Sequence, residues 1–345
     1  MNYILKDENA LYYECGFSCD NAVYLRFGSE AFFITDARYT NEALEYVKNA
    51  QVIEGDRRDL FVSVRETIAN AKIQEIFFNP NEWSLQAYEK MRLGLEDITF
   101  TQMANLSMEK RIIKTAQEIE ILDKAAYFGA KAFDRFAAFL AQEGRDLSEE
   151  RLHFEAEFLL RDQGAFALSF SPIVALGKNA AKPHALPTSD CLVQNELVLF
   201  DAGIKYQRYC SDRTRTSQFT PEINFEKAQT FTNATQQKIY DTVRKAQEAG
   251  IKKAKAGIRA YEVDLACREV IDKAGYGAYF IHSTGHGVGL DIHELPVIGA
   301  RSETLLQEGM VFTIEPGIYL GGEFGVRIED TVVLSNNGAQ ILGSC

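Results

Sequence analysis

Residues 281–296 read IHSTGHGVGLDIHELP and hold three of the five histidines of the chain, His282, His286 and His293. Glycines frame the central histidine, and a glycine lets the backbone approach a ligand closely. A lone histidine is more often a hydrogen-bonded core residue than a ligand. Three histidines within twelve positions instead favour a functional site, because imidazole binds metals and exchanges protons near neutral pH.

Carboxylates embedded in apolar runs are the partners that such histidines require. Residues 196–203 read ELVLFDAG and place Asp201 at the end of an apolar strand, and Asp212 follows further on. If the two flanking strands pair as a hairpin, Asp201 and Asp212 lie opposite each other on one face. Because like charges directly opposite each other are destabilising, burying this pair requires a cation.

Two later strand-like runs repeat this pattern. Residues 310–317 read MVFTIEPG and contain Glu315, and residues 326–334 read VRIEDTVVL. Strand alternation puts Arg327 and Glu329 on the same face of the second run. Four carboxylates with one imidazole form a hard, oxygen-rich ligand set that can hold two divalent cations, whereas a structural zinc site would favour cysteine.

The first hundred residues alternate short β-rich runs with helical patterns. Residues 22–27 and 31–35 flank Gly28, Ser29 and Glu30, which predicts a β-hairpin. The periodicity that follows predicts helices over 41–49, 60–71 and 84–95, and strands over 51–53, 75–78 and 98–100. This part is therefore a small α/β domain. The chain turns polar and basic between Met108 and Thr115, so we place domains at 1–112 and 113–345.

The second part begins with helices and ends with strands. Thr115 and Glu118 fit a capping box that opens a long helix. Helical periodicity predicts helices over 117–142, 148–162, 225–249 and 261–274, and the last 65 residues are mostly strand-like. Helices segregated from runs of strands indicate an α+β domain rather than a doubly wound sheet.

Composition excludes several classes of protein. The chain has 345 residues and a formal net charge of −12, which argues against nucleic-acid binding. Two acids, Asp7 and Glu8, stand where a signal peptide would begin its apolar core, and we expect a soluble, cytoplasmic protein without a membrane span. Six cysteines are too few for a disulfide framework, and we expect Cys15 and Cys19 to be small core residues rather than a metal or redox site.

Taken together, these motifs resemble the dinuclear metal signature of the pita-bread metallopeptidases, the family of methionine aminopeptidase, aminopeptidase P and prolidase. The resemblance covers about residues 115–345, and it implies the metal ligands Asp201, Asp212, His286, Glu315 and Glu329. Residues 33–40, FITDARYT, resemble the creatinase-type N-terminal domain, which methionine aminopeptidases lack. The combination points to the proline-directed branch.

The resemblance also implies roles for the other polar residues. His184 lines the substrate pocket and contacts the scissile region, His282 is a second pocket residue, and His293 polarises the substrate carbonyl. Arg327 neutralises the buried carboxylates, and Glu315 is the expected general base as well as a ligand. The catalytic residues are thus His184, His293 and Glu315, and the substrate-binding residues are His184, His282, His293 and Arg327.

The implied activity is hydrolysis of the bond between an N-terminal residue and proline by a hydroxide that two cations share. Mn²⁺ is expected first, with Co²⁺, Zn²⁺ or Fe²⁺ as alternatives. The resemblance also implies a homodimer. Non-catalytic pita-bread binding proteins and structural metal proteins are the other classes considered. His153 matches no family position and is expected to be structural.

Substrate length depends on the free carboxylate of proline. A dipeptidase must bind that carboxylate, whereas an aminopeptidase must leave this end open. Arg301 is the candidate for carboxylate capture, because arginine presents a bidentate fork, but it is equally interpretable as a solvated surface charge. We therefore predict an Xaa-Pro aminopeptidase, with an Xaa-Pro dipeptidase (prolidase) as the alternative.

Overall fold

The computed structural model describes residues 1–343, and its contacts divide the chain into two units. The division falls between Arg111 and Ile112. The first unit is built on one six-stranded sheet with the strand order β4-β3-β2-β1-β5-β6, in which only β2 runs against its neighbours. Its strands are β1 Asn2–Leu5, β2 Ala22–Phe27, β3 Glu30–Thr35, β4 Gln51–Glu54, β5 Glu75–Phe78 and β6 Thr99–Gln102.

Alternation along β1 and β2 separates two apolar clusters, one on each face of this sheet. Leu5 and Tyr24 belong to the cluster that contains Leu11 of the first helix, whereas Ile4 and Val23 pack on the other face. The sheet is therefore covered on both faces. The helices of this unit are α1 Glu8–Cys15, α2 Thr40–Tyr46, α3 Leu60–Asn70, the 3₁₀ turn η1 Pro80–Glu82, α4 Leu85–Arg92 and α5 Leu106–Lys110.

The predicted hairpin is confirmed, since β2 and β3 pair antiparallel with Ala22 opposite Thr35. The predicted alternation of helices and strands after it is also confirmed, with bounds that shift by a few residues. The prediction missed β1 and α1. The Asp7 carboxylate caps α1 by accepting from the backbone N–H groups of Asn9 and Ala10, so an acid considered only against a signal peptide begins a helix.

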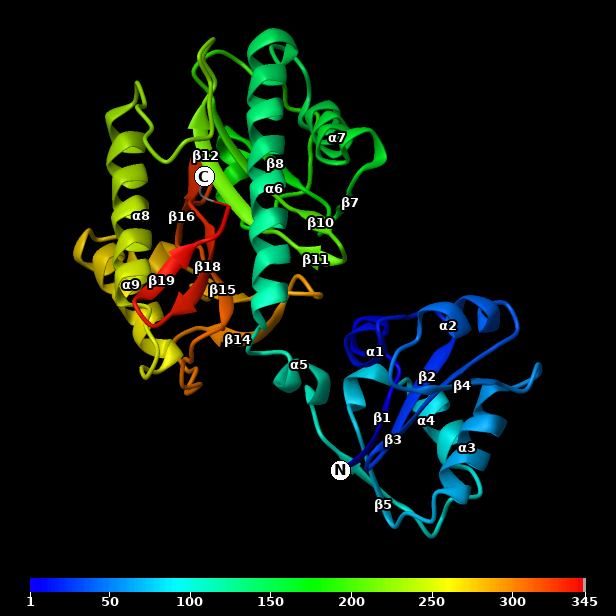
Figure 1. Cartoon of the computed structure of the whole chain (residues 1–345). Helices are drawn as coiled ribbons and strands as arrows, with labels where there is room; N and C mark the ends of the chain where they lie inside the picture. The colour runs from blue at the N-terminus through cyan, green and yellow to red at the C-terminus, as the bar shows by residue number, and fades with distance from the viewer. Residues whose placement is uncertain (344–345) are drawn as a thin grey trace. The chain divides into compact units, whose positions relative to one another are not determined.

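The second unit opens with the long helix α6 Ala116–Glu143 (Figure 1). The predicted capping box is confirmed, because the Thr115 hydroxyl accepts from the Glu118 N–H while the Glu118 carboxylate accepts from the Thr115 N–H. The other elements before the first long strand pair are α7 Glu149–Leu160, η2 Asp162–Gly164, β7 Ala167–Leu168, β8 Ile173–Leu176 and η3 Gly177–Ala181.

The sheets of this unit have the orders β12-β9-β8, β11-β10-β7, β14-β13-β15-β18-β19 and β16-β17. Their remaining strands are β9 Leu197–Ala202, β10 Ile204–Tyr206, β11 Tyr209–Cys210, β12 Arg213–Gln218, β13 Gly285–Gly287, β14 Glu294–Ile298, β15 Val311–Ile314, β16 Gly317–Leu320, β17 Phe324–Arg327, β18 Asp330–Ser335 and β19 Gly338–Ile341. The predicted strand-rich C-terminal region is thereby confirmed.

Strand β9 lies between two helical layers. Leu197 and Leu199 pack in the cluster that holds α8 Ala234–Lys253 and α9 Ala260–Lys273, which lie side by side (Figure 1). Val198 and Phe200 point the other way, into the cluster formed with α6 and α7. Burial on both faces explains why this strand reads as an uninterrupted apolar run. The carboxylate of Asp201 continues the first of these two faces.

Two sequence predictions in this unit are wrong in position. Helix α8 begins after Asn233, whose side chain caps it, and not at residue 225. Phe225 and Phe231 are buried in the segment before the helix, so their spacing reflects core packing rather than helical periodicity. In the β9/β12 pair, Asp201 faces Thr214 and not Asp212, which lies just before β12.

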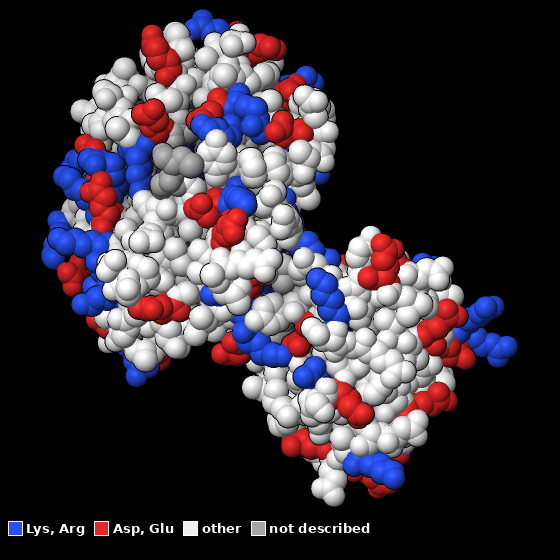
Figure 2. All heavy atoms as spheres, in the orientation of Figure 1, with Lys and Arg blue, Asp and Glu red and all other residues white. Residues whose placement is uncertain are grey.

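Charged side chains of both signs lie on the face drawn in Figure 2. Within the described residues no helix has the length and apolar character needed to cross a bilayer. Cys15 and Cys19 are buried in the core of the first unit, as predicted, and Cys345 lies outside the described residues.

Candidate functional site

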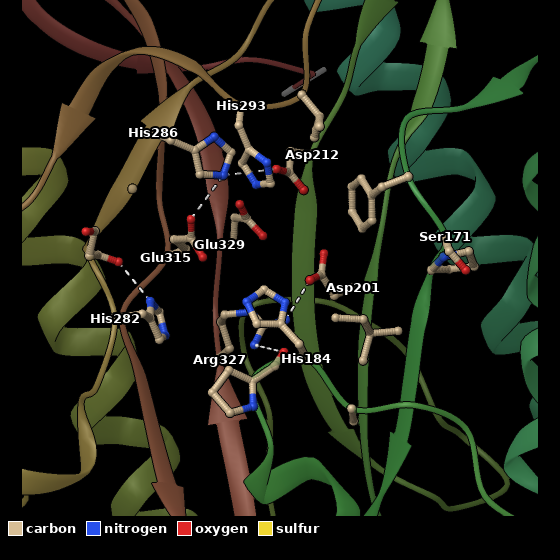
Figure 3. Close-up of a pocket in the computed structure, with 18 of the residues that line it drawn as sticks. Ser171, His184, Asp201, Asp212, His282, His286, His293, Glu315, Arg327 and Glu329 are labelled. Atoms are coloured by element: carbon tan, nitrogen blue, oxygen red, sulfur yellow. Dashed lines mark hydrogen bonds and ion pairs between the residues drawn. The ribbon is translucent and has the colours of Figure 1, made fainter. Parts of the chain in front are cut away.

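One cavity of about 560 Å³ in the second unit collects the predicted site residues (Figure 3). They come from segments far apart in the sequence: the turn after η3, the β9/β12 pair, the glycine-rich stretch around β13, and the strands β15 to β18. The residues from the sequence prediction that line this cavity are His184, Asp201, Asp212, His282, His286, His293, Glu315, Arg327 and Glu329.

Asp212, His286 and Glu329 form the tightest group, since one ligand atom from each lies within 4.8 Å of the others. His286 Nε2 is also 3.3 Å from Glu315 Oε1 and 3.6 Å from Asp212 Oδ2. Three carboxylates thus surround one imidazole nitrogen. This arrangement suits a divalent cation that accepts oxygen and nitrogen ligands.

The backbone sets the tautomer of His286. Its Nδ1 lies 3.1 Å from the carbonyl oxygen of Gly287, a geometry in which Nδ1–H donates and Nε2 is turned toward the carboxylates. The Thr313 hydroxyl adds support, because it accepts from the His286 N–H and donates to Glu315 Oε1 at 3.1 Å. These contacts orient a potential ligand through its outer neighbours.

Two buried carboxylate oxygens at this site are available to a metal ion. Asp201 Oδ1 and Glu329 Oε1 have no hydrogen-bond partner among the described residues. An unsatisfied buried acceptor is costly, and an anionic one more so. A cation held by these oxygens would remove that cost, so the residues present fit a metal centre.

Arg327 ties Asp201, the carboxylate of β9, to the wall of the cavity. Its Nη2 donates to Asp201 Oδ2 at 2.6 Å, its Nε to the Thr214 hydroxyl at 3.0 Å, and its Nη1 to the Tyr319 hydroxyl at 2.8 Å. The Thr214 hydroxyl in turn donates to Glu329 Oε2 at 2.6 Å. The sequence interpretation missed Tyr319 and Thr214. Two signals could have pointed to them: Tyr319 follows Gly317 by two residues, and Thr214 lies in the strand that pairs with β9.

Electrostatics in the cavity reflect crowded, buried anions. Burial and the neighbouring carboxylates raise the pKa of Asp212 and that of Glu329 well above the usual range, and burial also raises the pKa of Asp201. Burial acts in the same direction on Glu315, but His286, His282 and Arg327 together outweigh it and lower the pKa of this carboxyl group. Each raised pKa means that desolvation disfavours the ionised carboxylate. A bound cation would offset this free-energy cost.

The remaining histidines lie around this centre. The rings of His286 and His293 are 4.3 Å apart, and burial lowers the pKa of His293. His282 lies 2.9 Å from the Tyr319 hydroxyl through Nε2, and burial lowers its pKa as well. His184 is exposed on the opposite wall (Figure 3).

His153 and the framing glycines depart from the sequence interpretation. His153, which was expected to be structural, lines the cavity, and its Nε2 lies 3.1 Å from the Ser171 hydroxyl. Gly285 and Gly287 are needed because neighbouring strands, and not a ligand, approach closely. A Cβ at Gly285 would stand 1.9 Å from the Thr313 carbonyl oxygen, and one at Gly287 would stand 2.1 Å from that of Leu295.

Arg301 is exposed and is absent from the residues that line this cavity. It lines a neighbouring hollow instead. Among the described residues that line the main cavity the one arginine is Arg327, which already donates to Asp201 and to the Tyr319 hydroxyl.

Sequence profiles of two known families match the chain. The profile described as Metallopeptidase family M24 matches residues 120–336, and that of the Creatinase/Prolidase N-terminal domain matches residues 2–113. An uncharacterised peptidase of Bacillus subtilis, YqhT, is 35% identical over 326 residues, which cover 94% of this chain and 88% of that protein.

Solved structures of similar proteins extend over the whole chain. An Xaa-Pro dipeptidase from Bacillus anthracis superposes with a TM-score of 0.91 at 33% identity, covering 100% of this chain and 93% of that one. An X-Pro aminopeptidase from Thermotoga maritima superposes with a TM-score of 0.87 at 30% identity, covering 100% and 95%. The two names differ in the length of the substrate.

Proposed function

The chain belongs to metallopeptidase family M24, with a creatinase/prolidase N-terminal domain and a pita-bread catalytic domain, and from this premise we propose that it is an Xaa-Pro aminopeptidase. It would hydrolyse the peptide bond between an N-terminal residue and proline in peptides that continue beyond the proline. We propose the domain limits 1–112 and 113–345.

One observation carries the proposal: three buried carboxylates, the partly buried carboxylate of Glu315 and the Nε2 of one histidine face a single cavity, and two of the carboxylate oxygens there lack partners among the described residues. Divalent cations bound at such a site supply a Lewis acid and a water of lowered pKa. We propose two cations, held by Asp201, Asp212, His286, Glu315 and Glu329.

The residues around these ligands suit the remaining tasks of hydrolysis. Glu315 stands beside His286 with the Thr313 hydroxyl fixing one oxygen, which is a suitable position for a general base. His293, whose lowered pKa keeps its ring neutral near pH 7, is placed to donate to the substrate carbonyl oxygen as charge develops. Arg327 keeps Asp201 in one orientation, and His184 and His282 are proposed to contact the substrate.

Substrate length is the finer part of the proposal. The one arginine among the described lining residues of the cavity, Arg327, is engaged by Asp201, so a free proline carboxylate would find no available guanidinium there. This favours peptides whose carboxylate lies further along the chain. An Xaa-Pro dipeptidase is the second candidate, because the similar Bacillus anthracis protein bears that name.

Hydrolysis assays with metal-loaded protein test the proposal. We expect Xaa-Pro-Yaa tripeptides to lose their first residue, whereas matched Xaa-Ala-Yaa tripeptides are cleaved far more slowly. Efficient cleavage of Xaa-Pro dipeptides with intact tripeptides would establish the dipeptidase instead. Metal binding without hydrolysis of either peptide would favour a structural metal protein or a non-catalytic pita-bread binding protein.

The metal and the assembly are further parts of this proposal. Oxygen-rich ligand sets accept Mn²⁺, Co²⁺, Zn²⁺ or Fe²⁺, and we propose Mn²⁺ as the native ion. A cytoplasmic homodimer that acts on proline-containing peptides remains our prediction. Elemental analysis after reconstitution, with about two equivalents expected for a two-metal site, and sedimentation of the holoenzyme check these points.

A further inference from the structure

A second hollow adjoins the main cavity. It is lined by residues of α9, of the segment before β13 and of the turn after β14, among them Arg268, Phe280, Ile281, Ala300, Arg301 and Ser302. Both hollows also share His282, Ser283 and Val297 in their walls. The shared walls make the two hollows neighbours, and we call the second one the Arg301 hollow.

The two hollows differ in charge. Four carboxylates line the main cavity, whereas the described residues that line the Arg301 hollow include two arginines and no acid. Arg268 is already engaged, because it pairs with Asp264 and donates to the backbone carbonyl groups of Phe280 and His282. Arg301 forms no ion pair with any described residue, so its guanidinium is available to an incoming anion.

This difference orients a short peptide. A peptide carries an ammonium group at one end and a carboxylate at the other. The four carboxylates of the main cavity are engaged by the proposed cations, whereas the Arg301 hollow has an unpaired guanidinium and no acid among its described lining residues, so it attracts the carboxylate end. In an Xaa-Pro dipeptide the carboxylate is attached to proline and stays in the main cavity. One further residue moves it by up to about 3.5 Å along the chain, and in our proposal this step leads past Val297 to the Arg301 hollow.

We propose that the Arg301 hollow binds the C-terminal carboxylate of a short Xaa-Pro-Yaa peptide, with Arg301 as its cation. The proposal rests on the proposed function, since it names the substrate class of that same site. Arginine suits the task because its planar fork meets a carboxylate through two parallel hydrogen bonds. Arg301 is then a specificity-determining residue that selects short peptides with a free carboxyl end.

The test compares a tripeptide such as Ala-Pro-Gly with its C-terminal amide, which lacks the negative charge. Because Arg301 is exposed, the ion pair should favour the free acid in kcat/KM by about two- to fivefold, mainly through KM. Arg301→Gln should abolish this preference, and Arg301→Lys should retain part of it. Arg161→Gln, at an exposed arginine outside the lining of both hollows, should leave it unchanged.

Raising the salt concentration should weaken the preference of the wild-type protein, because an exposed ion pair is screened. Equal kcat/KM for acid and amide in the wild-type protein would overturn the proposal, as would a preference that survives in Arg301→Gln. A rise in KM for Xaa-Pro dipeptides in Arg301→Gln would overturn it in favour of a dipeptidase, in which Arg301 meets the proline carboxylate itself.

A binding measurement separates this proposal from the proposed function. Calorimetric titration of metal-free protein with Ala-Pro-Gly and with its amide requires no turnover. Tighter binding of the free-acid peptide that depends on Arg301 would support carboxylate binding in the Arg301 hollow, even if the metal-loaded protein cleaved no Xaa-Pro bond. Equal binding of the free acid and the amide would overturn carboxylate binding there, even if cleavage were efficient.

Discussion

Lys114 Nζ lies 2.5 Å from Glu294 Oε1, and the side chains of both residues are only 1% exposed. The pair joins the residue before the capping box of α6 to the residue that follows His293. The Glu294 carboxylate also packs over Gly289, where a Cβ would stand 2.2 Å from it. The ion pair therefore holds both ends of the loop that brings His293 to the cavity.

Breaking this pair should be costly. Lys114→Met removes a buried, charged partner of the Glu294 carboxylate and should lower the free energy of unfolding by about 1 to 3 kcal/mol. The double variant Lys114→Met/Glu294→Met should recover part of that loss. Lys124→Met is the matched control, because its ion pair with Glu120 is exposed and is worth about 0 to 1 kcal/mol.

Urea unfolding followed by circular dichroism measures these differences. Fluorescence is unsuitable, since the single tryptophan, Trp83, belongs to the first unit. If the double variant regains its stability but kcat remains low, the pair positions His293 as well as stabilising the fold. A Lys114→Met variant as stable as the Lys124→Met variant would contradict the buried ion pair.

A second prediction separates His293 from His153, two histidines that line the same cavity. His293→Ala should lower kcat by about 10² to 10⁴, the usual contribution of a group that acts on the proton or charge of the transition state. His153→Ala should change kcat far less, because its ring contacts the Ser171 hydroxyl and not the His286 group. Steady-state kinetics of both folded, metal-loaded variants give the comparison, and equal losses would refute the assigned role of His293.

A third prediction concerns Phe200, the residue that precedes Asp201. Its ring is completely buried, with ring centroids 4.3 Å from Phe133 and 4.4 Å from Phe136. Phe200→Ala should destabilise the second unit by about 3 to 5 kcal/mol, through lost burial and the cavity left behind. Phe158→Ala, at a residue that is 60% exposed, should change stability by no more than about 0.5 kcal/mol. Thermal unfolding monitored by circular dichroism tests this; similar costs for both variants would contradict the packing.

Local signals explain what the sequence could predict. The capping box at Thr115 and Glu118 fixes the start of α6 through contacts within four residues, so it is visible in the sequence alone. The site was also partly predictable, because acids such as Asp201 and Glu315 interrupt apolar runs that fold as buried strands. The cavity collects these acids because their strands are neighbours in the folded unit.

Longer-range packing explains the errors. The turn between β10 and β11 places Gln207 and Arg208 at positive φ, of 47° and 72°, and neither residue type signals such a turn. This two-residue turn sets one register for both strand pairs, with Tyr206 opposite Tyr209 and Asp201 opposite Thr214. Tyr319 was missed for a similar reason, since its hydroxyl reaches Arg327 only after β16 and β17 pair.

The last prediction concerns the reactivity of the cysteines toward a thiol reagent at pH 8. The thiolate is the reacting form, and burial raises the pKa of Cys15 to about 11 and that of Cys267 to about 12. Burial disfavours the charged thiolate, so at pH 8 only about one Cys15 thiol in a thousand is ionised. The ionised fraction of Cys267 is smaller still. Neither thiol is accessible in the folded protein, whereas Cys191 is exposed.

Cys191→Ser should therefore remove one rapidly reacting equivalent, and Cys267→Ser should remove none. Cys345 is present in both variants and cancels from the comparison. The reaction with an aromatic disulfide, followed by absorbance, gives the count under native conditions. In urea, where burial no longer protects the thiols, each variant should lose one equivalent relative to the wild-type protein. A rapid native equivalent lost in Cys267→Ser would show that α9 opens on the timescale of the reaction, contrary to the packing of Cys267 in the core.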